Sequence, residues 1–147
     1  MISIELARAL RDSDLVWRPV RGDNFCIDRI EADAEIYTLS DMTVEAHEFS
    51  SGTVLGFNGT TEWALDSVAL DDALWLPRED QLRELLAAAF VTLERIAATE
   101  SIGGVSIDAT AYRLTALVAG ENRAFEAPDA ADAYARALLA LLDTIAD

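Results

Sequence analysis

The spacing of apolar and polar positions predicts three amphipathic helices. The clearest begins at Pro77, because proline suits the first helical position, and it continues with a one-sided apolar face. That face comprises Leu82, Leu85, Leu86, Ala89 and Phe90. A first helix is expected from the capping residue Ser3 to about Asp12. Asp129 and Asp132 indicate the start of a final helix, whose wide apolar face extends to Ile145.

Shorter alternating or β-branched stretches predict antiparallel strands and hairpins. The expected strands are 15–19, 25–27, 36–39, 42–49, 53–57, 91–96, 112–118 and 123–126. Residues 91–96 could instead extend the preceding helix, but their alternation favours a strand. We expect 28–35 to be a loop, and 97–110 to be a loop around Gly103-Gly104 with at most a short strand at 105–107. Thr60 or Thr61 would cap a short helix that carries Trp63, Leu65 and Val68.

This order of elements favours an α+β fold in which antiparallel hairpins are flanked by helices. At 147 residues the chain is expected to form a single domain, 1–147. A shift of 76 positions aligns a few apolar residues of the first half with the second, among them Leu6 with Leu82 and Leu10 with Leu86. Two similar αβββα halves, 1–72 and 73–147, therefore remain an open alternative within that domain.

The charge balance narrows the range of partners. Eleven basic residues, all arginine, oppose 27 acidic residues, giving a formal net charge of −16. Such a field repels nucleic-acid phosphates and anionic lipids, so we expect no direct nucleic-acid binding and no membrane binding. The acidity either keeps the protein soluble or forms a face for a basic partner. With one cysteine and no export signal, the chain is expected to be cytoplasmic.

Three segments carry a resemblance to known proteins: 57–66 (Phe-Asn-Gly-Thr-Thr-Glu-Trp-Ala-Leu-Asp), 75–82 (Trp-Leu-Pro-Arg-Glu-Asp-Gln-Leu) and 130–139. Together they resemble a group of small uncharacterised actinobacterial proteins over nearly the whole chain. Members are sometimes labelled pilus-assembly proteins after a ParA-like ATPase, but that ATPase needs a phosphate-loop lysine and this chain has no lysine. The C-terminal half also resembles a small phage-type αβ sandwich domain of unknown role. Neither resemblance implies a catalytic residue.

Candidate catalytic and metal-binding residues are few. Glu45 and His47 would share one face of a strand and could supply two metal ligands or a general base, although a solvated outer face explains them equally. Cys26 is a candidate thiolate, or more simply a small buried hydrophobe. The acidic pairs at 71–72 and 79–80 could act in hydrolysis, but they flank the start of a helix. Carboxylates near a helix N-terminus interact favourably with the helix dipole, and this structural role is enough to explain them. The sequence therefore predicts neither a cofactor nor a catalytic centre.

Trp63 and Trp75 are expected in the core, which is the usual place for tryptophan in a small domain. If they are instead partly exposed, four aromatic residues could form an interaction surface: Tyr37, Phe57, Trp63 and Trp75. The leading hypothesis is a non-enzymatic protein-binding or adaptor domain. An immunity-type inhibitor or nucleic-acid mimic that binds a basic partner is the second, and a small enzyme or metal-binding protein using His47 is the third. A homodimer could form through an open sheet edge or the final helix.

Overall fold

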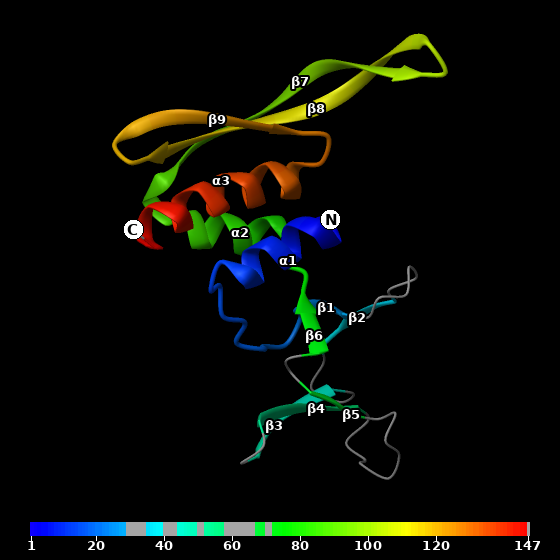
Figure 1. Cartoon of the computed structure of the whole chain (residues 1–147), viewed down its shortest axis with the longest axis vertical. Coiled ribbons are helices and arrows are strands. Elements are labelled where there is room, and N and C mark those ends of the chain that lie inside the picture. Colours follow the sequence, from blue (N-terminus) through cyan, green and yellow to red (C-terminus); the bar gives the residue numbers. More distant parts are fainter. Residues whose placement is uncertain (29–34, 40–43, 50–51, 58–66, 70–71, 147) are drawn as a thin grey trace. The chain divides into compact units, whose positions relative to one another are not determined.

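The computed structural model describes residues 1–28, 35–39, 44–49, 52–57, 67–69 and 72–146, and its fold is α+β (Figure 1). Every strand pairing in these ranges is antiparallel, which confirms the expected fold class. The chain divides into two compact units. Residues Leu15–Pro77 form one, here called the inserted unit, and Met1–Asp14 with Arg78–Asp147 form the other, the discontinuous unit. Among the described helices, none is both long and apolar enough to cross a membrane.

The discontinuous unit begins with helix α1 (Ile4–Asp12), at the position the sequence predicted. Ser3 is the N-cap, and its Oγ accepts a hydrogen bond from the backbone N–H of Leu6 at 3.3 Å. The backbone N–H of Ser3 donates to the carboxylate of Asp132 at 2.7 Å, which ties the start of α1 to helix α3 (Ala130–Ala146). The start of α1 is therefore fastened to the start of α3.

Helix α2 (Glu79–Leu86) begins two residues after Pro77, so the placement of proline at the first helical position is wrong. The reason is local: the Gln81 Oε1 accepts a hydrogen bond from the backbone N–H of Arg78 at 3.0 Å, which makes Arg78 the N-cap. Leu82 and Leu86 are buried. A 3-10 turn, η3 (Ala87–Ala89), follows and leads into the sheet.

The sheet of the discontinuous unit is dominated by one long hairpin. Strands β7 (Phe90–Ile102) and β8 (Val105–Val118) pair along their whole length, and β9 (Glu121–Ala127) pairs with the last seven residues of β8. The strand after Phe90 is confirmed, but the loop expected over 97–110 is wrong. Gly103 and Gly104 both adopt positive φ, as a two-residue hairpin turn requires, so pairing continues up to the turn.

The predicted hairpin between β8 and β9 is confirmed, although its turn is Ala119-Gly120 rather than 120–122. Helix α3 is also confirmed: the Asp129 Oδ1 accepts the backbone N–H of Ala131 at 2.8 Å at its start. Within this unit α3 lies between the sheet on one side and α1 and α2 on the other (Figure 1). Its alanines at 133, 135 and 137 have no exposed surface, because small side chains allow close packing on both sides.

In the inserted unit, β1 (Asn24–Ile27) pairs with β2 (Ile36–Thr38) on one side and β6 (Ala73–Trp75) on the other. The predicted strands at 25–27 and 36–39 are confirmed. The strand predicted at 15–19 is wrong: this segment is not a strand and pairs with none of the described strands. Hydrogen bonds to Asp23 hold this part of the chain instead. The Trp17 indole N–H donates to the Asp23 carboxylate, and so does the backbone N–H of Val20, the residue after the segment.

A second sheet of the inserted unit has the order β3-β4-β5. Strands β3 (Val44–Phe49) and β4 (Gly52–Phe57) form the predicted hairpin, and β5 (Ser67–Ala69) pairs with the other edge of β4. Val68 is opposite Leu55 in this pairing, so its assignment to a short helix is wrong; the ladder with β4 satisfies its backbone. The rest of that predicted helix, and most of the loop predicted at 28–35, lie outside the described residues.

Candidate functional site

Two of the four predicted interaction residues, Tyr37 and Trp75, lie on the sheet β2-β1-β6. Each is directly opposite Phe25 of the central strand, so the three side chains share one face of the sheet. Trp17 packs over them, parallel to Trp75 at 6.5 Å between ring centroids and tilted against Phe25 at 5.6 Å. The Phe25 and Tyr37 rings are 5.5 Å apart. These four residues are called the aromatic row.

The aromatic row forms the core of its sheet. Phe25 is fully buried, in a cluster with Leu39 and Ala73, and the other three rings are half-buried. The Trp75 Nε1 is buried and, among the described residues, has no hydrogen-bond partner. The row therefore offers a partner only the outer parts of Trp17, Tyr37 and Trp75.

Asp23 holds the aromatic row in place. Its carboxylate is 1% exposed, and its Oδ2 accepts hydrogen bonds from the Trp17 Nε1 at 2.9 Å and from the backbone N of Val20 at 3.0 Å. Its backbone carbonyl accepts the N–H of Leu39 at 2.8 Å. The sequence analysis assigned no role to Asp23, which lies between the predicted strands 15–19 and 25–27. The preference of aspartate for hydrogen bonds to its own turn was the available signal.

The other predicted site residues of the inserted unit do not belong to the aromatic row. Phe57 ends β4 opposite Val44, and Trp63 lies outside the described residues. Glu45 and His47 occupy alternate positions of β3, opposite Gly56 and Val54. Within the described part of the chain, no three His, Cys, Asp or Glu side chains are grouped in a way that could hold a metal ion.

The other candidate nucleophile and acids occupy structural positions. Cys26 is buried on β1 between Ile36 and Leu74 of the neighbouring strands. Asp72 is exposed, and its backbone carbonyl accepts the N–H of Asp28 at 2.8 Å, while Asp71 lies outside the described residues.

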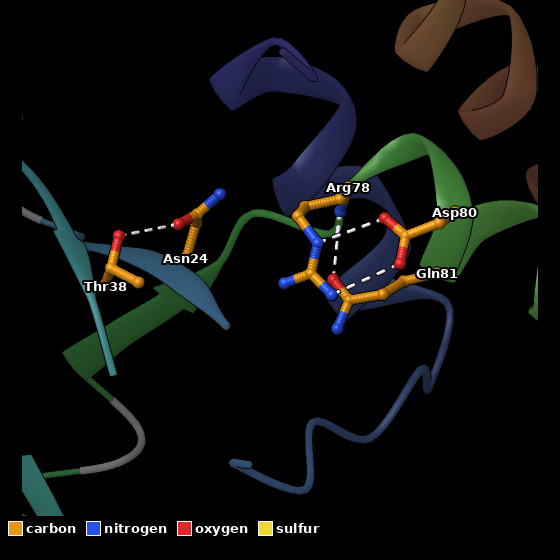
Figure 2. Close-up of polar contacts among 5 residues, drawn as sticks. All are labelled: Asn24, Thr38, Arg78, Asp80 and Gln81. Atoms are coloured by element: carbon orange, nitrogen blue, oxygen red, sulfur yellow. Dashed lines mark hydrogen bonds and ion pairs between the residues drawn. The ribbon is translucent and has the colours of Figure 1, made fainter. Parts of the chain in front are cut away.

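The acidic pair at the start of α2 includes Asp80, which forms a two-pronged ion pair with the Arg78 guanidinium. Nε to Oδ1 is 3.0 Å and Nη2 to Oδ2 is 3.2 Å (Figure 2). The pKa of the Asp80 carboxyl lies below its usual value because Arg78 donates these hydrogen bonds. Figure 2 also shows the Thr38 hydroxyl donating to the Asn24 Oδ1 at 2.8 Å, which joins β1 to β2. These contacts fix local structure at the start of α2 and between β1 and β2.

A surface that the sequence did not indicate lies on the part of the β7–β8 hairpin beyond β9. We call residues 96–111 the arm; it projects past the end of β9 and past α3 in Figure 1. Near β9, the apolar residues Leu93, Leu114, Ala116 and Val118 lie on the inner face, where β8 contacts α3. In the arm the pattern is inverted, and the apolar residues lie on the outer face.

The outer apolar patch consists of residues paired directly across the hairpin, which therefore share one face. Its members are Ile96, Ala98, Ile102, Val105, Ile107, Ala109 and Ala111. The three members nearest the turn are well exposed, Ile102 at 60%, Val105 at 62% and Ile107 at 45%, whereas Ile96 and the three alanines are half-buried. The inner face of the same stretch carries mainly polar residues, which are Thr99, Ser101, Ser106, Asp108 and Thr110 with Ala97.

Charge is scarce on the arm. Its two charged residues are Glu100, on the outer face, and Asp108, on the inner face. Closer to β9, the outer face carries an ion-paired cluster in which Arg113 lies 2.7 Å from the Glu126 carboxylate and 3.4 Å from that of Glu94. The apolar patch therefore has a charged border at its base. The alternation on both sides of Gly103-Gly104 was the signal in the sequence, hidden because the glycines suggested a loop.

Comparison with known proteins gives no match to a family model, to a curated protein or to a solved structure.

Proposed function

We propose that this protein is a protein-binding module and that the arm is its docking element. The observation that supports the proposal is the inverted pattern: apolar side chains lie on the outer face of the arm, where the hairpin next to it carries the ion-paired Glu94 and Arg113. Contiguous exposed apolar residues on a soluble chain mark interaction sites. Scarcity of charge at the centre of such a patch, with charged residues at its border, is typical of protein interfaces.

The arm also has the form of a docking element. Neither edge of the arm pairs with another described strand, since β9 pairs only with Tyr112–Val118 of β8. Natural edge strands are commonly protected by lysine, proline or inward-pointing charge; the arm contains neither lysine nor proline, and its one inner-face charge is Asp108. A binding role needs no catalytic group, which agrees with the lack of any catalytic motif in the sequence.

Photo-crosslinking in cells that produce the protein tests the proposal. A benzophenone amino acid replaces Ile107 on the outer face in one variant and Ser106 on the inner face in the other. Both positions are exposed and adjacent, so they form a matched pair. Adducts with polypeptide, read by mass spectrometry, are expected at 107 and not at 106. Equal labelling at both positions, or none at 107, would overturn the proposal.

A further inference from the structure

We propose that the outer apolar patch binds the same patch of a second copy of this chain, so that two arms pack face to face in a homodimer. This inference rests on the proposed function, since it takes the arm as a docking element and names its occupant. An isologous contact requires a patch that is complementary to itself in shape and in charge. Both requirements can be examined on the arm.

The shape of the patch is complementary to itself. Four successive rows cross the outer face: Ile96 with Ala111, Ala98 with Ala109, Glu100 with Ile107, and Ile102 with Val105. The second row is low because both side chains are methyl groups, and larger side chains stand on either side of it. A two-fold axis midway between the second and third rows places Ile107 of each copy over the alanine row of the other. Ile96 then faces the Ile102 and Val105 row.

The charge of the patch also suits a second copy. A basic partner would need carboxylates to pair with, and Glu100 is the one acidic residue on this face of the arm. The same two-fold axis places Glu100 of each copy over the alanine row of the other, but Glu100 belongs to β7, the edge strand among the described strands, so its carboxylate can reach water at the side of the contact. An almost uncharged patch is best matched by another uncharged patch.

The length of the arm reduces the repulsion between two chains of net charge −16. From Tyr112, where pairing with β9 ends, to the turn at Gly104 the arm extends about 27 Å at ~3.4 Å per residue. The Debye length at physiological salt is about 8 Å. The tip of each arm is therefore about three Debye lengths from the end of β9 in its own chain, and at the base of the patch Arg113 is ion-paired with Glu94 and Glu126.

The area of the patch sets the strength of the dimer. Seven residues along two strands cover about 24 by 10 Å, or roughly 500 Å² in projection for two copies. Stable complexes bury about 1,200 Å² or more. The homodimer is therefore expected to be weak, with a dissociation constant in the micromolar to millimolar range.

Sedimentation velocity of the purified chain tests this inference, from about 10 to about 500 µM. The wild-type protein is expected to move from the monomer to the dimer mass as concentration rises. Ile107→Asp and Ile102→Asp should weaken dimerisation at least tenfold, since each places a carboxylate in the contact. Ser106→Asp, one residue away on the inner face, should dimerise like the wild-type protein. All three sites are exposed in the monomer, so folding is not at stake.

Two results would overturn the inference. One is a wild-type protein that stays monomeric over the whole range. The other is a dimer that both isoleucine variants leave intact, since it would use another surface. Crosslinking at Ile107 to a different polypeptide, with a monomeric wild-type protein, would overturn the homodimer while the proposed function stands. A monomer without any adduct at 107 would remove both.

Discussion

At the scale of single residues, the buried carboxylate of Asp23 supports the aromatic row. It accepts two hydrogen bonds, from the Trp17 indole at 2.9 Å and from the backbone of Val20 at 3.0 Å. Hydrogen bonds to a charged group contribute more than neutral ones, and removing the acceptor leaves both donors unsatisfied. Asp23 thus adds a polar anchor to the packing of Trp17 on Phe25 and Trp75.

We predict that Asp23→Ala lowers the free energy of unfolding by about 2–3 kcal/mol, because two charge-assisted hydrogen bonds are lost. Urea unfolding followed by tryptophan fluorescence measures this directly. Asp72→Ala is the control, since Asp72 is exposed in the same unit, and a change within about 0.5 kcal/mol is expected. Equal effects of the two substitutions would show that Asp23 does not anchor Trp17.

A second residue, Tyr134, makes the discontinuous unit sensitive to alkaline pH. Its side chain is 4% exposed and stacks on Phe90 at 5.9 Å. Burial raises the pKa of the Tyr134 phenol above its ordinary value. The folded protein therefore favours the neutral phenol of Tyr134. This contribution to the free energy of unfolding is fully present below the pKa of the unfolded chain, about 10, and it is lost as pH rises through the higher pKa of the folded protein.

Tyr134→Phe is therefore expected to lose less stability than the wild-type protein when pH rises from about 9 to about 11, because it has no phenol to ionise. The measurement is urea unfolding at several pH values in this window. Parallel loss of stability in both proteins would contradict a role for Tyr134. At neutral pH the two should differ little by this mechanism.

At the scale of elements, helix α3 is packed on two sides. Its contacts are with β8 and β9 on one side and with α1 and α2 on the other, and Ala135 has no exposed surface. Interiors at this density do not accommodate added methylenes without shifting their neighbours. The alanines of α3 therefore set the spacing between the layers.

Ala135→Leu is predicted to destabilise the protein by about 1–3 kcal/mol through overpacking. Ala146→Leu, at the exposed end of the same helix, is the matched control and should be nearly neutral. Thermal unfolding followed by circular dichroism at 222 nm gives the comparison. A neutral Ala135→Leu would mean that the layers are not closely packed at this position.

Sequence patterns predicted an element correctly where the residues that define it are close together in the chain. Helices α1 and α3 were located from caps and apolar periodicity, both of which act within a few residues. The arm was missed because Gly103-Gly104 is compatible with either a loop or a tight turn, and only pairing across the hairpin decides between them. The segment 15–19 was misassigned because its alternation reflects the packing of Trp17, whose indole N–H donates to Asp23, and not pairing with another strand.

At the scale of the whole molecule, the division into two units depends on contacts between distant segments. No local pattern indicates that Met1–Asp14 belongs with Arg78–Asp147. The hydrogen bond from the backbone of Ser3 to Asp132 joins residues 129 positions apart. The candidate site was equally hidden, since the faces of the arm are defined by strand register and not by composition.

The discontinuous unit also imposes an order on folding during synthesis. Helix α1 leaves the ribosome first, but it contacts α3, which is made last of the described elements. The whole of Leu15–Pro77 is synthesised in between, and its sheets pair within themselves. The inserted unit can therefore fold while the chain is still growing, whereas α1 must wait for translation of α3.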